Sequence, residues 1–189
     1  MNKEQYDHII ASLWVILARE EVLASVDCLA ECADVDVARL REIFPTPEKI
    51  ILALIEDVWT RLSLPDKTEK LTSRDQIFDA VMMAFDLVAP YRSGLKKMTQ
   101  DRLLSPSTYL DIAPRLTRFG SDIVKHYYDD DGIFAIGVTL AFNAAFATTF
   151  WTFLEDDTFD LSKTMASLDA SLKTVSSVLS YCPGSVKFE

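Results

Sequence analysis

The sequence predicts an all-α protein of about nine helices. Apolar side chains recur at helical spacing along most of the 189 residues. Glycine and proline are scarce, with five and seven residues, whereas an all-β fold needs many turns. Apolar residues make up 49% of the chain, enough for a substantial buried core. The polar stretch 66–73 interrupts the helical pattern, so we expect a small domain over residues 1–63 and a larger one over residues 64–189.

The N-terminal part carries four expected helices, over residues 4–19, 25–32, 36–43 and 46–62. Asp36 is a good N-cap for the third helix, because its carboxylate can accept from the free N–H groups of the first turn. Thr46 caps the fourth helix. Pro47 takes the first helical position, where a missing N–H costs nothing.

The C-terminal part carries five expected helices, over residues 74–89, 91–103, 107–127, 132–154 and 162–181. Prolines punctuate them at positions 90, 106 and 183.

The longest apolar stretch, residues 133–154, has the length of a membrane span. Acidic runs flank it at 129–131 and 155–157, and no cluster of Lys or Arg anchors it. We therefore interpret it as a buried helix and expect no stable membrane span. The chain starts with an amphipathic helix and has no apolar signal region, so we expect a cytoplasmic protein.

A helix-turn-helix is predicted over residues 25–43, because two short helices follow each other across three or four residues. The string LAECADVD at 29–36, followed by FPTPEK at 44–49, resembles the TetR family of transcriptional regulators. Members of that family typically read IAE-x-AGVS and HF-x-(S/N)-KEEL at these places. Asp34 stands where the family has its turn glycine. Aspartate tolerates the left-handed backbone, so we expect the turn to be kept.

The resemblance implies a TetR-like fold, with a three-helix DNA-binding domain and a helical domain for ligand binding and dimerisation. It implies a homodimer that binds double-stranded operator DNA and responds to a small apolar ligand. Carried onto this sequence, the DNA-binding positions are Asp36, Val37, Arg39, Arg41, Thr46 and Lys49.

The charge of the N-terminal part is unfavourable for DNA. Residues 1–62 hold six Lys and Arg against twelve Asp and Glu, and the whole chain has a net charge of −10. Phosphates repel such a surface unless cations gather locally. Either DNA binding uses a narrow set of contacts, carried by Arg39, Arg41 and Lys49, or this part has kept the fold and lost the ability to bind DNA.

The second half resembles another branch of the same superfamily. The strings DQIFDAVMM at 75–83, APYR at 89–92 and WTFLEDDTFDLSKTMASLD at 151–169 are similar to ubiquinone-biosynthesis accessory proteins, which share the TetR fold and bind lipids. Proteins known simply as TetR regulators carry the last string too. The resemblance is therefore compatible with two functions, that of a transcriptional regulator and that of a lipid-binding protein.

Large apolar side chains in the second half predict a pocket for an apolar or lipid ligand. The expected lining comprises Phe78, Met82, Phe85, Tyr91, Met98, Phe119, Tyr127, Phe142, Asn143 and Phe146. Asn143 stands on an otherwise apolar helix. Its amide is either a polar handle for the ligand or a cap for a neighbouring backbone group.

The last two helices predict the dimer interface, since family members pair through a four-helix bundle built from them. The expected contacts are Phe150, Leu154, Leu168, Leu172, Val175 and Leu179. We find no phosphate loop, nucleophile elbow or metal-ligand spacing in the sequence, so we expect no catalytic residues, no metal and no cofactor.

Overall fold

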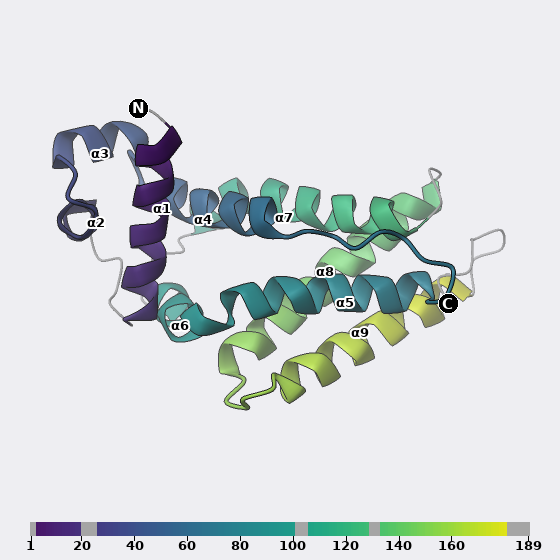
Figure 1. The fold of residues 1–189 in the computed structure, drawn as a ribbon. Coiled ribbons are helices and arrows are strands. Elements are labelled where there is room, and N and C mark those ends of the chain that lie inside the picture. The colour runs from purple at the N-terminus through teal and green to yellow at the C-terminus, as the bar shows by residue number, and fades with distance from the viewer. Residues whose placement is uncertain (1–2, 20–25, 101–105, 129–132, 181–189) are drawn as a thin grey trace. The chain divides into compact units, whose positions relative to one another are not determined.

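The computed structural model describes residues 3–19, 26–100, 106–128 and 133–180 (Figure 1). Within these residues every regular element is helical, which confirms the all-α prediction. The helices are α1 (Lys3–Ala18), α2 (Val26–Ala33), α3 (Val37–Ile43), α4 (Pro47–Arg61), α5 (Ser73–Val88), α6 (Arg92–Gln100), α7 (Pro106–Tyr127), α8 (Ile133–Glu155) and α9 (Ser162–Ser180). A 3-10 turn, η1 (Ala89–Tyr91), joins α5 to α6.

The chain forms two compact units that alternate along the sequence. Unit 1 comprises Met1–Arg61 and Leu87–Arg115, and unit 2 comprises Leu62–Asp86 and Leu116–Glu189. The break after Arg61 falls close to the expected boundary at residue 63. The expected division differs in one respect, because residues 87–115 belong with the N-terminal unit.

The core of unit 1 gathers around α1. This helix packs against α2, α4, η1 and α6, and α2 packs against α3 (Figure 1). Leu13 and Leu17 on α1, Leu29 on α2 and Leu40 on α3 are all fully buried in one cluster. Burial of each such side chain contributes about 1.5–3 kcal/mol, so the short helices α2 and α3 depend on this core for their stability.

A close backbone approach explains why α6 belongs to unit 1. A Cβ atom at Gly94 would lie 2.3 Å from the carbonyl oxygen of Leu17, so only glycine lets α6 come this near to α1. The ring of Tyr91 lies 4.6 Å from that of Trp14, and Met98 is buried in the same core. A sequence pattern does not reveal such long-range packing.

Unit 2 is built from most of α5, the second half of α7, and α8 and α9, which pack along each other. Its centre is a group of stacked and tilted phenyl rings on α5, α7 and α8, whose members are Phe85, Phe119, Phe142, Phe146 and Phe153. The segment before α5 is held by hydrogen bonds. The hydroxyl of Tyr127 donates to the carbonyl of Pro65 (3.0 Å), and the amide of Gln76 both accepts from and donates to the backbone of Thr68.

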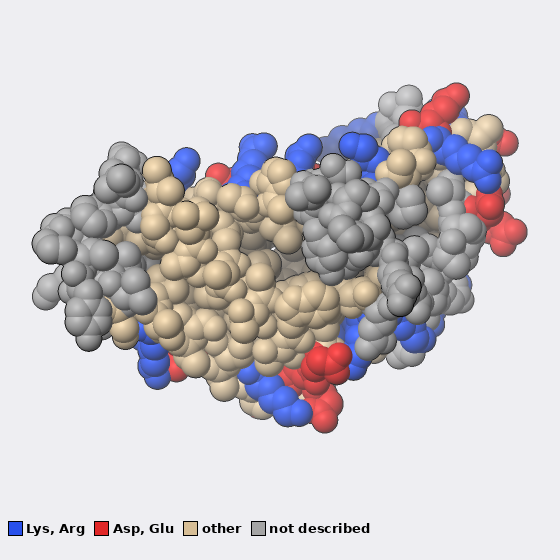
Figure 2. Space-filling view, turned by 180° about the vertical axis from the view of Figure 1, so that it is seen from behind, with Lys and Arg blue, Asp and Glu red and all other residues tan. Residues whose placement is uncertain are grey.

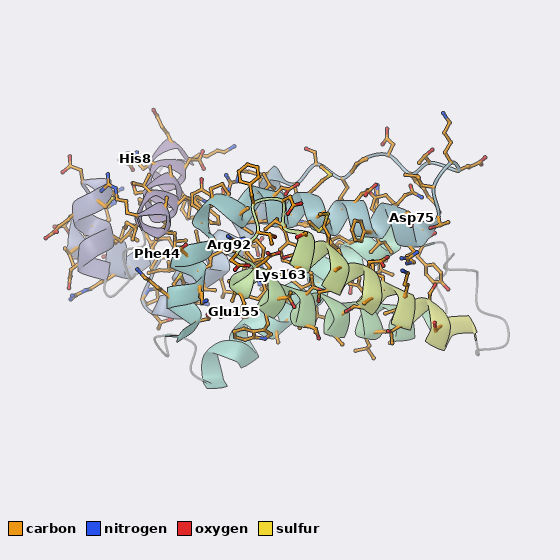
Figure 3. The ribbon with its side chains drawn as sticks, turned by 90° about the horizontal axis from the view of Figure 1, so that it is seen from below. His8, Phe44, Asp75, Arg92, Glu155 and Lys163 are labelled. Atoms are coloured by element: carbon orange, nitrogen blue, oxygen red, sulfur yellow. The ribbon has the colours of Figure 1, made fainter. Side chains whose placement is uncertain are left out.

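A buried carboxylate organises the turn between α8 and α9. Asp156 is 1% exposed and accepts hydrogen bonds from the backbone and hydroxyl groups of both Thr158 and Thr164. Burial by itself would raise the pKa of Asp156, but these four hydrogen bonds outweigh it and hold the pKa well below its ordinary value. Figure 3 labels Glu155 and Lys163 on either side of this turn.

Among the described residues, one helical segment, Ile136–Glu155, is long and apolar enough to cross a membrane by length and composition. In the isolated chain, 28% of its most apolar stretch is buried.

Candidate functional site

The helix-turn-helix has the geometry that the sequence predicts. Asp34 adopts a left-handed backbone, with φ of 51°, between α2 and α3. The turn is closed by a hydrogen bond from the N–H of Val35 to the carbonyl of Ala30 (3.0 Å). Aspartate therefore does at this position what glycine does in the family pattern.

Helix α3 begins at the expected cap. The Oδ1 atom of Asp36 accepts from the backbone N–H of Arg39 (3.1 Å), which satisfies one free donor of the first turn. Phe44 ends the helix and is buried in the core of unit 1, where Figure 3 labels it. Val37, another of the expected DNA-binding positions, is half-buried and packs against that core.

The two arginines of α3 are exposed but engaged by the chain itself. The guanidinium of Arg41 forms an ion pair with Asp27 of α2 (3.0 Å), with both side chains more than half exposed. The guanidinium of Arg39 donates to the amide oxygen of Gln5 on α1 (3.3 Å). Exposed pairs of this kind contribute little to stability, about 0–1 kcal/mol, so either cation can exchange its partner for a phosphate at small cost.

The start of α4 adds two exposed polar positions to the same unit. Thr46 and Lys49 are both exposed, and the N–H of Lys49 donates to the carbonyl of Thr46 (3.1 Å). Five of the six expected DNA-binding side chains are therefore exposed: Asp36, Arg39, Arg41, Thr46 and Lys49.

A polar network ties α1 to α4 behind this surface. The indole N–H of Trp14 donates to Asp57 Oδ2 (2.7 Å), and Arg61 pairs with the same oxygen (3.0 Å). The guanidinium of Arg61 also lies over the Trp14 ring, 5.1 Å from its centroid. These contacts fix the angle between the two helices that frame the helix-turn-helix.

The carboxylates of unit 1 create a negative local potential. Burial, and then the charges of Asp57, Glu56 and Asp7, raise the pKa of the Tyr6 phenol above its ordinary value. Tyr6 lies beside Phe44, with ring centroids 6.5 Å apart. The surplus of carboxylates in residues 1–62 would repel a phosphate that approaches α3, and the exposed arginines must overcome that repulsion.

The aromatic lining expected for a ligand site lies mostly in unit 2. Phe85, Phe119, Tyr127 and Phe142 are buried there, whereas four other side chains of the expected set are half-buried: Phe78, Met82, Asn143 and Phe146. Two expected members are misplaced. Tyr91 and Met98 pack in the core of unit 1, because α6 follows α1 and not the bundle of unit 2.

One member of the expected lining has an unusual polar environment. The Nδ2 atom of Asn143 is buried and has no hydrogen-bond partner among the described residues. Its Oδ1 atom lies only 2.1 Å from where a Cβ atom would stand at Gly120, so α7 and α8 meet closely at this point.

The stripe expected to form the dimer interface faces inward. Leu154, Leu168, Leu172 and Val175 are all buried within unit 2, because α9 packs its apolar side against the chain's own α8. Phe150 is half-buried, with its ring beside those of Trp151 and Phe153, and the side chain of Leu179 lies outside the described residues. The four buried positions are therefore core residues of the single chain, and their assignment to a dimer interface stays a prediction.

A different apolar face is exposed on α8. Three large side chains lie along it, with relative exposures of 62% for Ile136, 63% for Leu140 and 48% for Trp151. The small residues Ala144 and Ala147 are exposed between them. These positions recur every three or four residues and share one side of the helix. Seen from behind, a broad tan area left of centre carries described Lys, Arg, Asp and Glu only along its edges (Figure 2).

The sequence contains a signal for this face in the composition of α8. Residues 133–154 carry no charge and are apolar on all sides of the helix. Such a helix is either fully enclosed or covered by a partner.

Comparison with solved structures identifies the fold of the chain. The chain is similar to the crystal structure of the TetR transcriptional regulator from Nitrosomonas europaea ATCC 19718, with a TM-score of 0.72 and 15% identity. The match covers 92% of this chain and 98% of that one. No protein-family model and no curated protein sequence matches the chain. The TetR fold expected from the first sixty or so residues thus extends over nearly the whole chain.

Proposed function

We propose that this protein is a homodimeric transcriptional regulator that binds operator DNA through α3 and responds to a small apolar ligand in unit 2. The observation that carries the proposal is the intact helix-turn-helix. Asp34 keeps the left-handed turn, Asp36 caps α3, and Arg39 and Arg41 remain exposed on it. A helix presented in this way fits the major groove of DNA.

The exposed face of α8 supports the homodimer. A solvent-exposed row of Ile136, Leu140 and Trp151 is unfavourable in water, and a second copy related by a two-fold axis would cover it with the same side chains. A two-fold dimer also presents two copies of α3 to one duplex, as palindromic operators require.

The test is fluorescence anisotropy of a labelled DNA duplex with the wild-type protein and two variants. Arg39→Ala and Arg41→Ala are each expected to weaken binding about three- to tenfold, because each removes a phosphate or base contact. Arg118→Ala is the matched control, since Arg118 is an exposed arginine of unit 2 that lies near Asp122 of its own helix (3.8 Å). Equal loss in all three variants, or no loss in any, would reject α3 as the DNA-reading helix.

A second candidate is a lipid-binding accessory protein whose helix-turn-helix no longer binds DNA. The engagement of Arg41 by Asp27, and of Arg39 by Gln5, favours it, because both cations already have partners in the chain. This candidate predicts no salt-sensitive DNA binding and a lipid that co-purifies with the protein. Mass spectrometry of an organic extract would detect that lipid, and an empty extract combined with DNA binding would exclude the candidate.

A further inference from the structure

The amide nitrogen of Asn143 is an unused donor inside unit 2. It is buried without a partner among the described residues, although such groups are nearly always satisfied in folded proteins. An orphaned buried donor costs free energy, so its persistence on a helix that is otherwise apolar needs an explanation.

Aromatic side chains flank the close contact between α7 and α8 at which the Asn143 amide lies. Phe142, its neighbour on α8, comes within 3.0 Å of the position of a Cβ atom at Gly120, on the same side as the Asn143 amide. The ring of Phe119 on α7 lies 5.5 Å from that of Phe146 on α8. A buried water needs two to four polar partners, and phenyl rings offer none. An apolar molecule with one suitably placed acceptor matches this environment better than water does.

We propose that the ligand of unit 2 is an apolar molecule that carries a carbonyl oxygen, and that this oxygen accepts a hydrogen bond from Asn143 Nδ2. The inference rests on the proposed function only in assuming that unit 2 binds a small apolar molecule. The phenyl rings take up the hydrocarbon part of the ligand, and the single amide sets its orientation. A pure hydrocarbon leaves the donor unpaired and therefore binds more weakly than a carbonyl compound of the same size.

Gly120 controls the position of the donor. Its lack of a side chain lets the Asn143 amide lie against α7, and a methyl group at this position would displace the amide. Gly120→Ala therefore moves the donor without removing it. Asn143→Leu removes the donor and keeps a side chain of similar size.

The experiment compares a ketone with the alkane of equal length. The free concentrations of 2-undecanone and undecane over solutions of the full-length protein are measured by headspace gas chromatography, which gives both affinities without a dye or DNA. In the wild-type protein the ratio of ketone to alkane affinity is expected to be about fivefold higher than in Asn143→Leu, a factor that corresponds to about 1 kcal/mol for one neutral hydrogen bond. Gly120→Ala is expected to lower the ratio as well, while the affinity for the alkane changes less.

Thr174→Ala is the control, because this exposed hydroxyl on α9 donates to the carbonyl of Ala170 in its own helix. Its ratio should equal that of the wild-type protein. The same ratio in wild type and Asn143→Leu, or no binding of either compound to the wild-type protein, overturns the proposal. The headspace assay contains no DNA, so a negative result in it does not bear on the regulator hypothesis. A negative result in the DNA-binding assay, in turn, does not affect the measured ketone-to-alkane ratio.

Discussion

Replacing Leu140 by aspartate on the exposed face of α8 should dissociate the proposed homodimer. Burying a Leu or Ile side chain completely contributes about 2 kcal/mol, and Ile136 and Leu140 are still nearly two-thirds exposed in the single chain. Each therefore offers roughly 1.2 kcal/mol to an interface, and the half-exposed indole of Trp151 offers about 2 kcal/mol. Two-fold symmetry doubles these contributions to about 9 kcal/mol, before the entropic cost of association is subtracted.

Leu140→Asp removes the apolar contribution on both sides and places two carboxylates in the interface. Leaving a charge buried and unpaired costs about 3–5 kcal/mol, so the dimer should weaken by at least a factor of about one thousand. Sedimentation velocity at tens of micromolar protein would show the wild type as a dimer and Leu140→Asp as a monomer.

Leu71→Asp is the matched control, because Leu71 has a comparable exposure of 45% and lies in the segment before α5. It should leave the dimer intact. A dimer that survives Leu140→Asp, or a wild-type protein that sediments as a monomer, would refute the assignment of this face.

Three further perturbations follow from individual contacts. Asp156→Asn should lower the free energy of unfolding by about 2 kcal/mol at pH 7, measured by urea denaturation, because its amide group cannot accept from all four donors. Since the pKa of Asp156 is lowered in the folded protein, its contribution is present above about pH 4 and is lost as the pH falls further. An equally steep acid destabilisation in the variant would contradict this. Gly94→Ala should cost about 1–3 kcal/mol in the same assay, because the new methyl group meets backbone atoms, and an unchanged urea midpoint would contradict the close approach of α6 to α1. Asp27→Asn should raise the affinity for a DNA duplex about twofold at low salt, because it frees Arg41 and removes a negative charge near the DNA. Repulsion between that charge and a phosphate about 8 Å away in water amounts to about 0.5 kcal/mol. A weaker affinity would show that the ion pair orients Arg41 for binding.

Local features of this fold could be predicted from the sequence because local chemistry determines them. The cap at Asp36 and the left-handed turn at Asp34 depend on the preferences of single residues and their neighbours, and both were predicted correctly. The helix boundaries agree to within one or two residues for most elements, since prolines and caps mark them.

Features that depend on long-range packing could not be predicted in the same way. Tyr91 and Met98, expected in the ligand site, pack in the core of unit 1 because Gly94 lets α6 pack on α1, a contact between residues far apart in the sequence. The stripe expected at the dimer interface shows the same limit. An apolar stripe such as that of Leu168 and Leu172 shows that a helix is covered, but not whether its own chain or a second copy covers it.

The salt dependence of duplex binding by the wild-type protein tests most directly whether the helix-turn-helix binds DNA. Three exposed cations lie on α3 and at the start of α4 of each subunit, Arg39, Arg41 and Lys49, so a dimer that uses them neutralises about six phosphates. The logarithm of the affinity should then fall with the logarithm of salt concentration with a slope of about −5, a loss of about one thousandfold between 50 and 200 mM salt. Absence of binding at 50 mM salt, or binding that salt does not weaken, would contradict the account and favour the lipid-binding candidate.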